Sequence, residues 1–175
     1  LGTGILQLGS RSPAMLAMTA MTLNSMSKGR FTLGLGASGP QVVEGWHGVP
    51  FARTLPRIRD AVNIVRMASR GERVAYKGEY YELPRPGGEG KALKTSAPPM
   101  QFPIYLATLS PKSLELTGEI ADGWIGTSFM PEHADVFFDH MRRGAEKAGR
   151  TLADLDIQAA AGVVAFGDDV EKLVA

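Results

Sequence analysis

The 175-residue chain contains no cysteine, no excess of either charge and no long apolar run. Without cysteine there is no disulfide framework, no thiolate metal site and no cysteine nucleophile. Its 19 basic and 18 acidic residues give a net charge of +1, whereas nucleic-acid binders usually carry a basic excess. No apolar stretch reaches the about 18 residues that a membrane span requires. A content of 44% hydrophobic residues excludes a disordered chain, so we expect a cytoplasmic globular α/β domain.

The sequence pattern at each end of the chain is that of a strand or helix of which only a part is present. The first six residues, Leu1 to Leu6, have the pattern of a strand already under way, with no initiator methionine and no charged leader before an apolar signal segment. The last eight residues, from Asp168 to Ala175, have the pattern of a helix in its first turns. We therefore expect a central fragment of a longer protein.

Helical spacing of apolar residues alternates with short apolar runs. Helices are predicted from Ser12-Pro13 to Gly29, around Leu55–Val65 up to Gly71, from Ser110-Pro111, and from Pro131 to Gly149. Five strands are predicted between them: Leu1–Leu6, Phe31–Gly36, Ile104–Thr108, Gly123–Thr127 and Ile157–Phe166.

These strands are hydrophobic throughout rather than alternating, which is typical of a parallel sheet that is covered on both faces. Two architectures fit this pattern, an open doubly wound sheet and part of a (β/α)8 barrel. Because a complete barrel needs about 250 residues, the chain would hold only part of one. We treat residues 1–175 as a single domain.

Residues 72–103 form the one region that departs from the α/β alternation. Val74–Leu83 alternates around Lys77-Gly78 and predicts a small hairpin. Pro84–Pro103 follows as a loop rich in Gly, Pro and Lys, and a loop of roughly 20 residues in a compact domain is usually a lid, a binding loop or disordered.

Three loops at predicted strand ends are candidate ligand sites, because parallel α/β proteins bind ligands at the carboxyl ends of their strands. Gly34–Pro40 is built of small residues that allow either close ligand approach or a simple turn. At Thr108–Ser113 the helix start and Lys112 could bind phosphate, with simple helix capping as the alternative. Thr3–Gln7 belongs to an opening strand with two glycines, Gly2 and Gly4, which indicate a bulge or the close approach of something flat, with the end of a truncated fragment as the alternative.

The other polar residues give weaker signals. His47 follows Trp46 in a loop, as a substrate contact or as a packed residue, while His133 and His140 fit a solvated helix face. Asp122 precedes a strand, at the end opposite the expected chemistry, and is predicted to be structural. The sequence shows no metal-ligand spacing, no nucleophile elbow and no carboxylate pair for hydrolysis.

Several segments, taken in chain order, resemble the bacterial luciferase-like superfamily, and most of all its coenzyme F420-dependent oxidoreductases such as methylenetetrahydromethanopterin reductase. The resemblance rests on Leu1–Ile5, Leu23–Phe31, Leu33–Gly36, Ser38–Gly48, Tyr80–Tyr81, Pro103–Ala107 and Ala121–Trp124. It implies a (β/α)8 barrel with an insertion, here at about 72–103. The chain would cover the middle of that barrel, from the end of the third strand to the start of the seventh helix.

The resemblance also implies a cofactor site. In F420-dependent members a non-prolyl cis peptide, matched here by Gly4–Ile5, forms a bulge behind the deazaflavin ring. The cofactor tail runs along one matching loop, and its phosphate lies at a helix start. The cofactor-binding residues implied in this way are Gly4, Ile5, Gln7, Ala37, Ser38, Gly39, Thr108, Leu109 and Ser110. Residues implied on the substrate side are Trp46, His47 and Thr127.

The expected function is hydride transfer between F420 and an organic substrate, and two alternative functions remain open. The first is an FMN-dependent monooxygenase of the same superfamily, and the second is an inactive fragment or binding module. Gly39 and Met130 stand where the related sugar-phosphate dehydrogenase has an acidic residue and a lysine, so sugar-phosphate oxidation is not expected. No catalytic acid or base is assigned. The resemblance further implies a homodimer for the full-length protein.

Overall fold

A computed structural model describes residues 1–127 and 129–159 of the chain. Its main feature is a parallel sheet of five strands, and a separate antiparallel pair is formed by β3 (Tyr76–Lys77) and β4 (Glu82–Leu83). The five strands, in the order in which they pair, are β1 (Leu6–Gln7), β2 (Leu33–Gly36), β5 (Ile104–Ala107), β6 (Gly123–Gly126) and β7 (Asp156–Ala159).

The strand order decides between the two predicted architectures. Each strand of the sheet pairs in parallel with the next one along the chain, so the order β1-β2-β5-β6-β7 never reverses. A doubly wound sheet contains a reversal of strand order, whereas a (β/α)8 barrel is wound in one direction. The observed sheet is therefore part of a barrel, as one of the two alternatives predicted.

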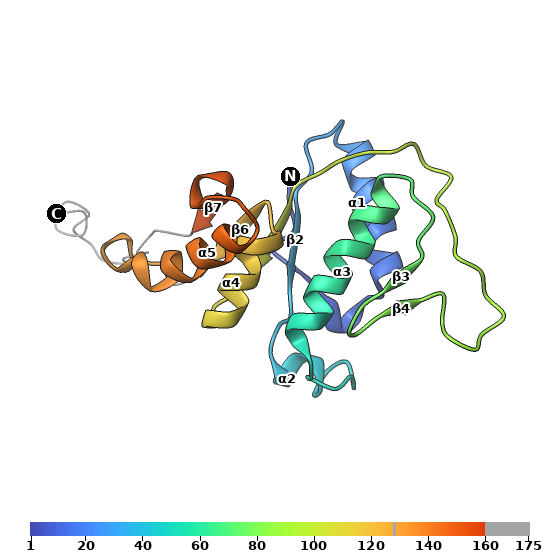
Figure 1. Cartoon of the computed structure of the whole chain (residues 1–175), viewed down its shortest axis with the longest axis horizontal. Coiled ribbons are helices and arrows are strands. Elements are labelled where there is room, and N and C mark those ends of the chain that lie inside the picture. The colour runs from blue at the N-terminus through green and yellow to red at the C-terminus, as the bar shows by residue number, and fades with distance from the viewer. Residues whose placement is uncertain (128, 160–175) are drawn as a thin grey trace, which may run out of the picture.

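Helices connect the strands (Figure 1). The helix side chains of the two core clusters pack on the face of the sheet that carries Leu35, Leu106 and Trp124, whereas the sequence pattern predicted cover on both faces. The α-helices are α1 (Pro13–Met26), α2 (Pro40–Val43), α3 (Thr54–Ser69), α4 (Pro111–Ile120) and α5 (Asp135–Lys147). Short 3-10 turns are η1 (Leu8–Ser10), η2 (Pro131–His133) and η3 (Leu152–Asp154). In the part of the chain that the structure describes, no helix has the length and apolar character to cross a membrane.

The predicted signals at helix ends explain the observed boundaries. The Ser12 hydroxyl accepts a hydrogen bond from the backbone N–H of Met15 at 3.2 Å, and Pro13 is the first residue of α1. After α1 the chain turns at Gly29, with a φ of 77°, in the left-handed region that favours glycine. Gly149 follows α5 in the same conformation, with a φ of 68°.

Three predictions of local structure need correction. The first strand is shorter than predicted, because only Leu6–Gln7 forms a continuous ladder and Gly2 makes a single bridge to Thr32. The loop after β2 contains the four-residue helix α2, too short to produce a periodic pattern. The last strand, predicted over Ile157–Phe166, starts at Asp156, and its residues beyond Ala159 lie outside the described part of the chain.

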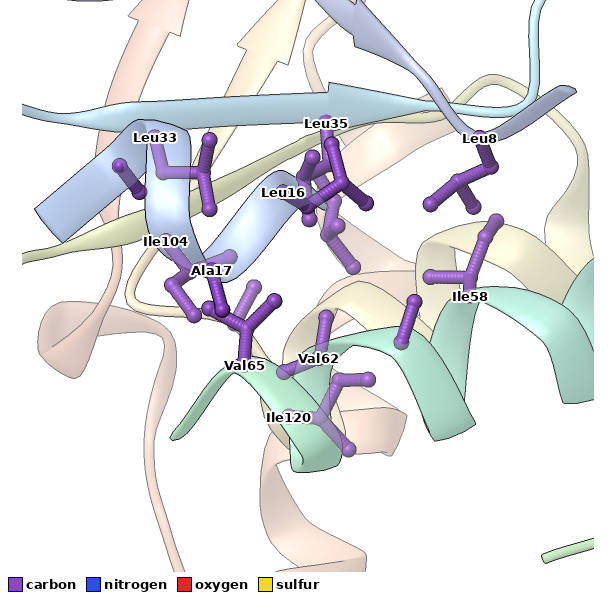
Figure 2. Packing of buried hydrophobic residues seen from close by; sticks show 14 of the residues in the cluster. Leu8, Leu16, Ala17, Leu33, Leu35, Ile58, Val62, Val65, Ile104 and Ile120 are labelled. Carbon is purple, nitrogen blue, oxygen red and sulfur yellow. The ribbon is translucent and has the colours of Figure 1, made fainter. Parts of the chain in front are cut away.

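The main core lies between the sheet and helices α1 and α3 (Figure 2). Alternate residues of the strands point toward these helices: Leu33 and Leu35 from β2, and Ile104 and Leu106 from β5. Leu16 of α1 meets them, and all five side chains are buried. Complete burial of each such side chain contributes about 1.5–3 kcal/mol, so this face of the sheet holds the helices in place.

A second, smaller core joins α4, α5 and β6 around the buried ring of Trp124. The indole N–H of Trp124 donates to the carbonyl oxygen of Thr108 at 2.9 Å, which ties the end of β5 to β6. The two helices approach closely because a Cβ at Gly118 would meet the backbone of Met141, and one at Gly144 would meet the backbone of Glu115.

Residues 72–103 lie on the outer side of α3 (Figure 1). The predicted hairpin is confirmed as β3 and β4, with Gly78 N–H donating to the carbonyl oxygen of Tyr81 at 2.9 Å in the turn. The buried carboxylate of Asp60 in α3 anchors this hairpin by accepting hydrogen bonds from the backbone N–H groups of Tyr80 and Tyr81, at 2.7 and 2.9 Å. The hairpin is thus fixed to α3.

Candidate functional site

The sequence-predicted site residues gather at one edge of the sheet. Strand register aligns Gln7 with Gly36 and Gly36 with Ala107, so β1, β2 and β5 end side by side. Neighbouring strands are about 4.8 Å apart, which places the ends of β1 and β5 roughly 10 Å apart. Two of the predicted cofactor segments, Ala37–Gly39 and Thr108–Ser110, follow β2 and β5, while the first, Gly4–Gln7, leads into β1 and ends at its last residue, so all three segments lie near this edge.

The segment before β1 contains a bulge. Gly2 bridges Thr32, and Leu6 pairs with Leu35, so the first segment uses one residue more than β2 between the same two pairings. The Thr3 hydroxyl fills the gap in the ladder: it donates to the carbonyl oxygen of Gly34 and accepts from the Gly34 N–H, both at 2.9 Å. The predicted bulge is therefore confirmed.

The peptide bond between Gly4 and Ile5 is cis, as the resemblance implied. Glycines on β2 make room for this segment, because a Cβ on Gly34 would overlap the carbonyl oxygen of Thr3, and one on Gly36 would overlap Cδ1 of Ile5. At Gly4 the situation is the reverse: an added Cβ would meet no atom within 4 Å. The bulge therefore presents bare backbone to open space, which suits the face of a flat ring.

An open groove of about 840 Å³ adjoins the bulge. Two of the residues that line it contact each other: Nε2 of His47 lies 3.1 Å from Oε1 of Gln7. The groove is bounded by β1, the start of α1, and the segment that includes α2 and the residues after it. Its lining residues are Ile5, Leu6, Gln7, Ser10, Arg11, Met15, Gln41, Val42, Trp46 and His47.

The loop after β2 runs between the other two segments. Ala37, Ser38 and Gly39 are half-buried, and Ser38 adopts a left-handed conformation with a φ of 62°. Gly39 precedes α2 in an extended conformation, and its carbonyl oxygen accepts from the N–H of Val43 at 2.9 Å. The loop is a tight, small-residue connection that leaves room for a ligand along the strand ends.

The loop after β5 leads into α4. The Thr108 hydroxyl is buried and 2.7 Å from that of Thr117, so its role is structural and only its backbone can face a ligand. Ser110 occupies the N-cap position, but its hydroxyl accepts no hydrogen bond from the first turn of the helix, contrary to the capping alternative; it donates to the Ser113 hydroxyl at 2.9 Å. The first-turn N–H groups of α4 are thus left without a side-chain cap, beside exposed Leu109.

The residues predicted for the substrate side divide into two groups. Trp46 and His47 line the groove; Trp46 is 83% exposed, while His47 is half-buried and contacts Gln7. Thr127 is exposed after β6 and does not line the groove. Arg11 and Met15 were not predicted, although Arg11 lies in the segment directly after β1, where the rule of strand ends would have indicated it.

Residues at the amino ends of the strands have structural roles. Asp122, predicted as structural, accepts hydrogen bonds through Oδ2 from the backbone N–H of Ile104 at 2.9 Å and from Nη2 of Arg66 at 3.1 Å. The Tyr105 hydroxyl donates to Asp156, and burial together with this hydrogen bond raises the pKa of Tyr105 to about 12. In residues 1–127 and 129–159 no three His, Asp or Glu side chains group as a metal site requires.

A singly wound parallel sheet with ligand-sized space at its carboxyl edge defines a (β/α)-barrel protein whose site is built from strand-end loops. The sequence profile of the luciferase-like monooxygenase family matches residues 1–175. The chain therefore belongs to the luciferase-like monooxygenase family, and its fold is part of that family's (β/α)8 barrel.

Individual relatives support this membership. Rv3520c of Mycobacterium tuberculosis, named as a coenzyme F420-dependent oxidoreductase, is 41% identical over 177 residues, covering 96% of this chain and 51% of the relative. The 5,10-methylenetetrahydromethanopterin reductase of Archaeoglobus fulgidus is 32% identical over 163 residues, covering 93% and 47%. The solved structure of the coenzyme F420-dependent tetrahydromethanopterin reductase from Methanopyrus kandleri superposes with a TM-score of 0.80 at 26% identity, covering 91% and 48%. The chain thus spans about half the length of the relatives it matches.

Proposed function

We propose that this chain forms the cofactor-binding part of a coenzyme F420-dependent oxidoreductase that transfers hydride between the deazaflavin and a small organic substrate. The observation that carries the proposal is the common edge formed by the bulge at Gly4, the loop at Ala37–Gly39 and the start of α4. The F420 dependence that is named for Rv3520c, for a glucose-6-phosphate dehydrogenase of Nakamurella multipartita and for the solved reductase of Methanopyrus kandleri supports the same cofactor.

Each segment has a separate role in this proposal. The bare backbone at Gly4 and Ile5 supports one face of the ring, and Gln7 hydrogen-bonds its polar edge. The uncapped first turn of α4, with Lys112 beside it, binds the phosphate through backbone N–H groups and the positive end of the helix dipole. F420, when bound, supplies the carbon that gives or accepts the hydride.

The groove beside the bulge is the proposed substrate site. Trp46 and Met15 contribute exposed apolar surface to it, while His47 and Arg11 contribute polar groups. A substrate in this groove would be shielded from water on the side of α1 and of the segment after α2. Sugar phosphates remain outside the proposed substrate class, because Gly39 and exposed Met130 offer neither a carboxylate nor a cation.

The alternative cofactor is FMN, which a monooxygenase of this family would use. The family match itself favours keeping this alternative, because the family is described by its monooxygenases. A planar flavin ring would find the same bare backbone at Gly4, so the bulge does not separate the two cofactors.

Titration of the purified protein with F420 and, separately, with FMN tests the proposal. Saturable binding of F420, followed by its absorbance and fluorescence, together with much weaker binding of FMN, is the expected result. Preferential binding of FMN would replace the proposal with the monooxygenase alternative. A folded protein that binds neither cofactor would instead be the inactive fragment or binding module.

The proposal includes an organisation as one domain and a homodimer in the full-length protein. Residues 72–103 are fixed to α3 by Asp60, which supports one domain with an insertion over these residues. Helix α1 contains no charged residue, yet Met26 at its end is 76% exposed, and exposed apolar surface of this kind is typical of a protein interface. Light scattering of the wild type and of Met26→Glu tests the dimer, which the charge should weaken.

A cytoplasmic location is part of the same proposal. Its support is the complete absence of cysteine from the 175 residues, since small proteins of oxidising compartments commonly carry disulfides.

A further inference from the structure

A second cavity lies outside the sheet, between helices α1 and α3 and the loop of residues 84–103. Its volume is about 410 Å³, within the about 300–1,000 Å³ typical of ligand pockets. It shares no lining residue with the groove beside the bulge. Its lining residues are Ala14, Ala17, Met18, Ile64, Ala68, Val74, Leu83, Pro84, Lys91, Ala92, Leu93, Lys94 and Thr95.

Hydrogen bonds hold the loop that forms the outer wall of this cavity. The N–H of Val74 donates to the carbonyl oxygen of Leu93 at 2.8 Å, and Nη1 of Arg73 donates to that of Ala92 at 2.6 Å. Farther along, the N–H of Met100 donates to the carbonyl oxygen of Ser69 at 2.8 Å. These hydrogen bonds hold the loop in place over α1 and α3, and the cavity lies between the loop and the two helices.

Small side chains create the space under the loop. Five helix residues line the cavity, and three of them are alanines: Ala14 and Ala17 on α1 and Ala68 on α3, beside Met18 and Ile64. The helices lie side by side at this point (Figure 1). Because alanine has only a methyl group, the two helices and the loop leave an apolar cavity rather than an interdigitated core.

Polar groups are few and are confined to the loop side. The Thr95 hydroxyl oxygen is buried, with no hydrogen-bond partner among the described residues. Lys91 and Lys94 also line the cavity, and within residues 1–127 and 129–159 neither forms a salt bridge. An apolar chamber with two cations and one hydroxyl on the same wall is complementary to an apolar tail that ends in an anion.

We propose that this cavity binds a medium-chain carboxylic acid, with the hydrocarbon tail against the alanines of α1 and α3. The carboxylate pairs with Lys91 and Lys94 and accepts a hydrogen bond from the Thr95 hydroxyl. The site lies apart from the proposed cofactor edge, so it is an additional ligand site and its occupancy does not depend on the proposed function.

Fluorescence titration with dansylundecanoic acid tests the tail pocket, with dodecanoate as the competitor. Ala14→Leu should weaken probe binding about tenfold, as expected when roughly two methylenes lose their place in an apolar cavity. Ser25→Leu adds the same side chain at an exposed position of α1 outside the cavity and should leave binding unchanged. Equal affinities of wild type and Ala14→Leu would overturn the proposal.

The carboxylate is tested by charge reversal. The double variant Lys91→Glu/Lys94→Glu should bind dodecanoate about tenfold more weakly but dodecanol as the wild type does, since two partly exposed ion pairs are lost. Arg85→Glu, in the same loop but outside the cavity, is the matched control. If dodecanol competes as well as dodecanoate in the wild type, the carboxylate assignment is wrong. Titration of the same variants with F420 separates this result from a failure of the proposed function, because F420 affinity should not change.

Discussion

His47 Nε2 lies 3.1 Å from Oε1 of Gln7, and this contact joins the last residue of β1 to the segment that follows α2. Because the amide oxygen can only accept, the histidine nitrogen is the donor. The contact fixes the Gln7 carboxamide at the border between the bulge and the groove. Gln7 thus lies on the proposed cofactor side of the contact, and His47 on the proposed substrate side.

The first prediction separates these two sides. Gln7→Leu should weaken F420 binding about fivefold, because one hydrogen bond to the ring edge contributes about 1 kcal/mol. His47→Ala should change F420 affinity less than about twofold, since it removes only the partner of Gln7. Fluorescence titration with F420 measures both variants. An equal loss of affinity in both would place His47 on the cofactor side.

The second prediction concerns the open space at Gly4. Gly4→Val should reduce F420 affinity by about tenfold to a hundredfold, because the new side chain would occupy the space assigned to the ring and force overpacking of about 1–3 kcal/mol. The fold should be unaffected, since a Cβ at Gly4 meets no atom within 4 Å. Titration with F420 measures the affinity, and urea unfolding measures the stability.

Gly34→Ala is the matched variant at a glycine of the same edge. Its Cβ would overlap the carbonyl oxygen of Thr3, so it should lower the free energy of unfolding by about 1–3 kcal/mol. The two glycines thus differ in what they make room for, a ligand at Gly4 and the chain itself at Gly34. Wild-type F420 affinity in Gly4→Val would remove the support for a ring at the bulge.

Those parts of the fold that single residues determine could be predicted from the sequence. Pro13 and Gly29 define the two ends of α1. The proline ring restricts φ to values that suit the first turn of a helix, and the left-handed φ of Gly29 is one that other residues rarely adopt. The bulge could be predicted for the same reason, since a glycine within a buried strand weakens the ladder unless it has a conformational use.

Features that depend on how distant segments meet could not be predicted. The Ser110 hydroxyl was free to cap α4 or to bond a neighbour, and only the folded geometry shows that it donates to Ser113. Arg11 and Met15 line the groove because α1 begins directly after β1 and η1. The alternative roles of His47 depended on which distant residue it meets, and in the fold that residue is Gln7. Periodicity carries no information about such contacts.

The third prediction concerns the attachment of the inserted hairpin to α3. Asp60→Asn should lower the free energy of unfolding by about 1–3 kcal/mol, because an amide cannot accept on both sides as the carboxylate does. The carboxylate accepts from two backbone N–H groups and from the Tyr76 hydroxyl at 2.8 Å, and that hydroxyl already accepts from Asn63 at 3.1 Å. Urea unfolding measures the loss, and proteolysis at Lys77 should accelerate. Asp139→Asn, at an exposed site of α5, is the control, and equal stability of the two variants would contradict the anchoring role.

The fourth prediction concerns pH and the ion pair that links α3 to α4. Nη1 and Nη2 of Arg59 each donate to a carboxylate oxygen of Glu119 at 2.6 Å, and these hydrogen bonds lower the pKa of Glu119 in the folded protein. A lowered folded-state pKa gives stability that is present above the unfolded-state pKa of about 4.3 and is lost as the pH falls through the folded-state value.

Glu119→Gln should therefore lower the free energy of unfolding at pH 7 by about 0.5–1 kcal/mol, a modest value because both partners are partly exposed. The difference between wild type and variant should shrink as the pH falls below about 4, since protonated Glu119 and glutamine are both neutral. Urea unfolding at the two pH values measures this difference. Glu146→Gln, at an exposed position of α5, should show little difference at either pH. A stability gap for Glu119→Gln that stays constant in acid would show that the packing of α3 on α4, and not the charge of the pair, is what the substitution disturbs.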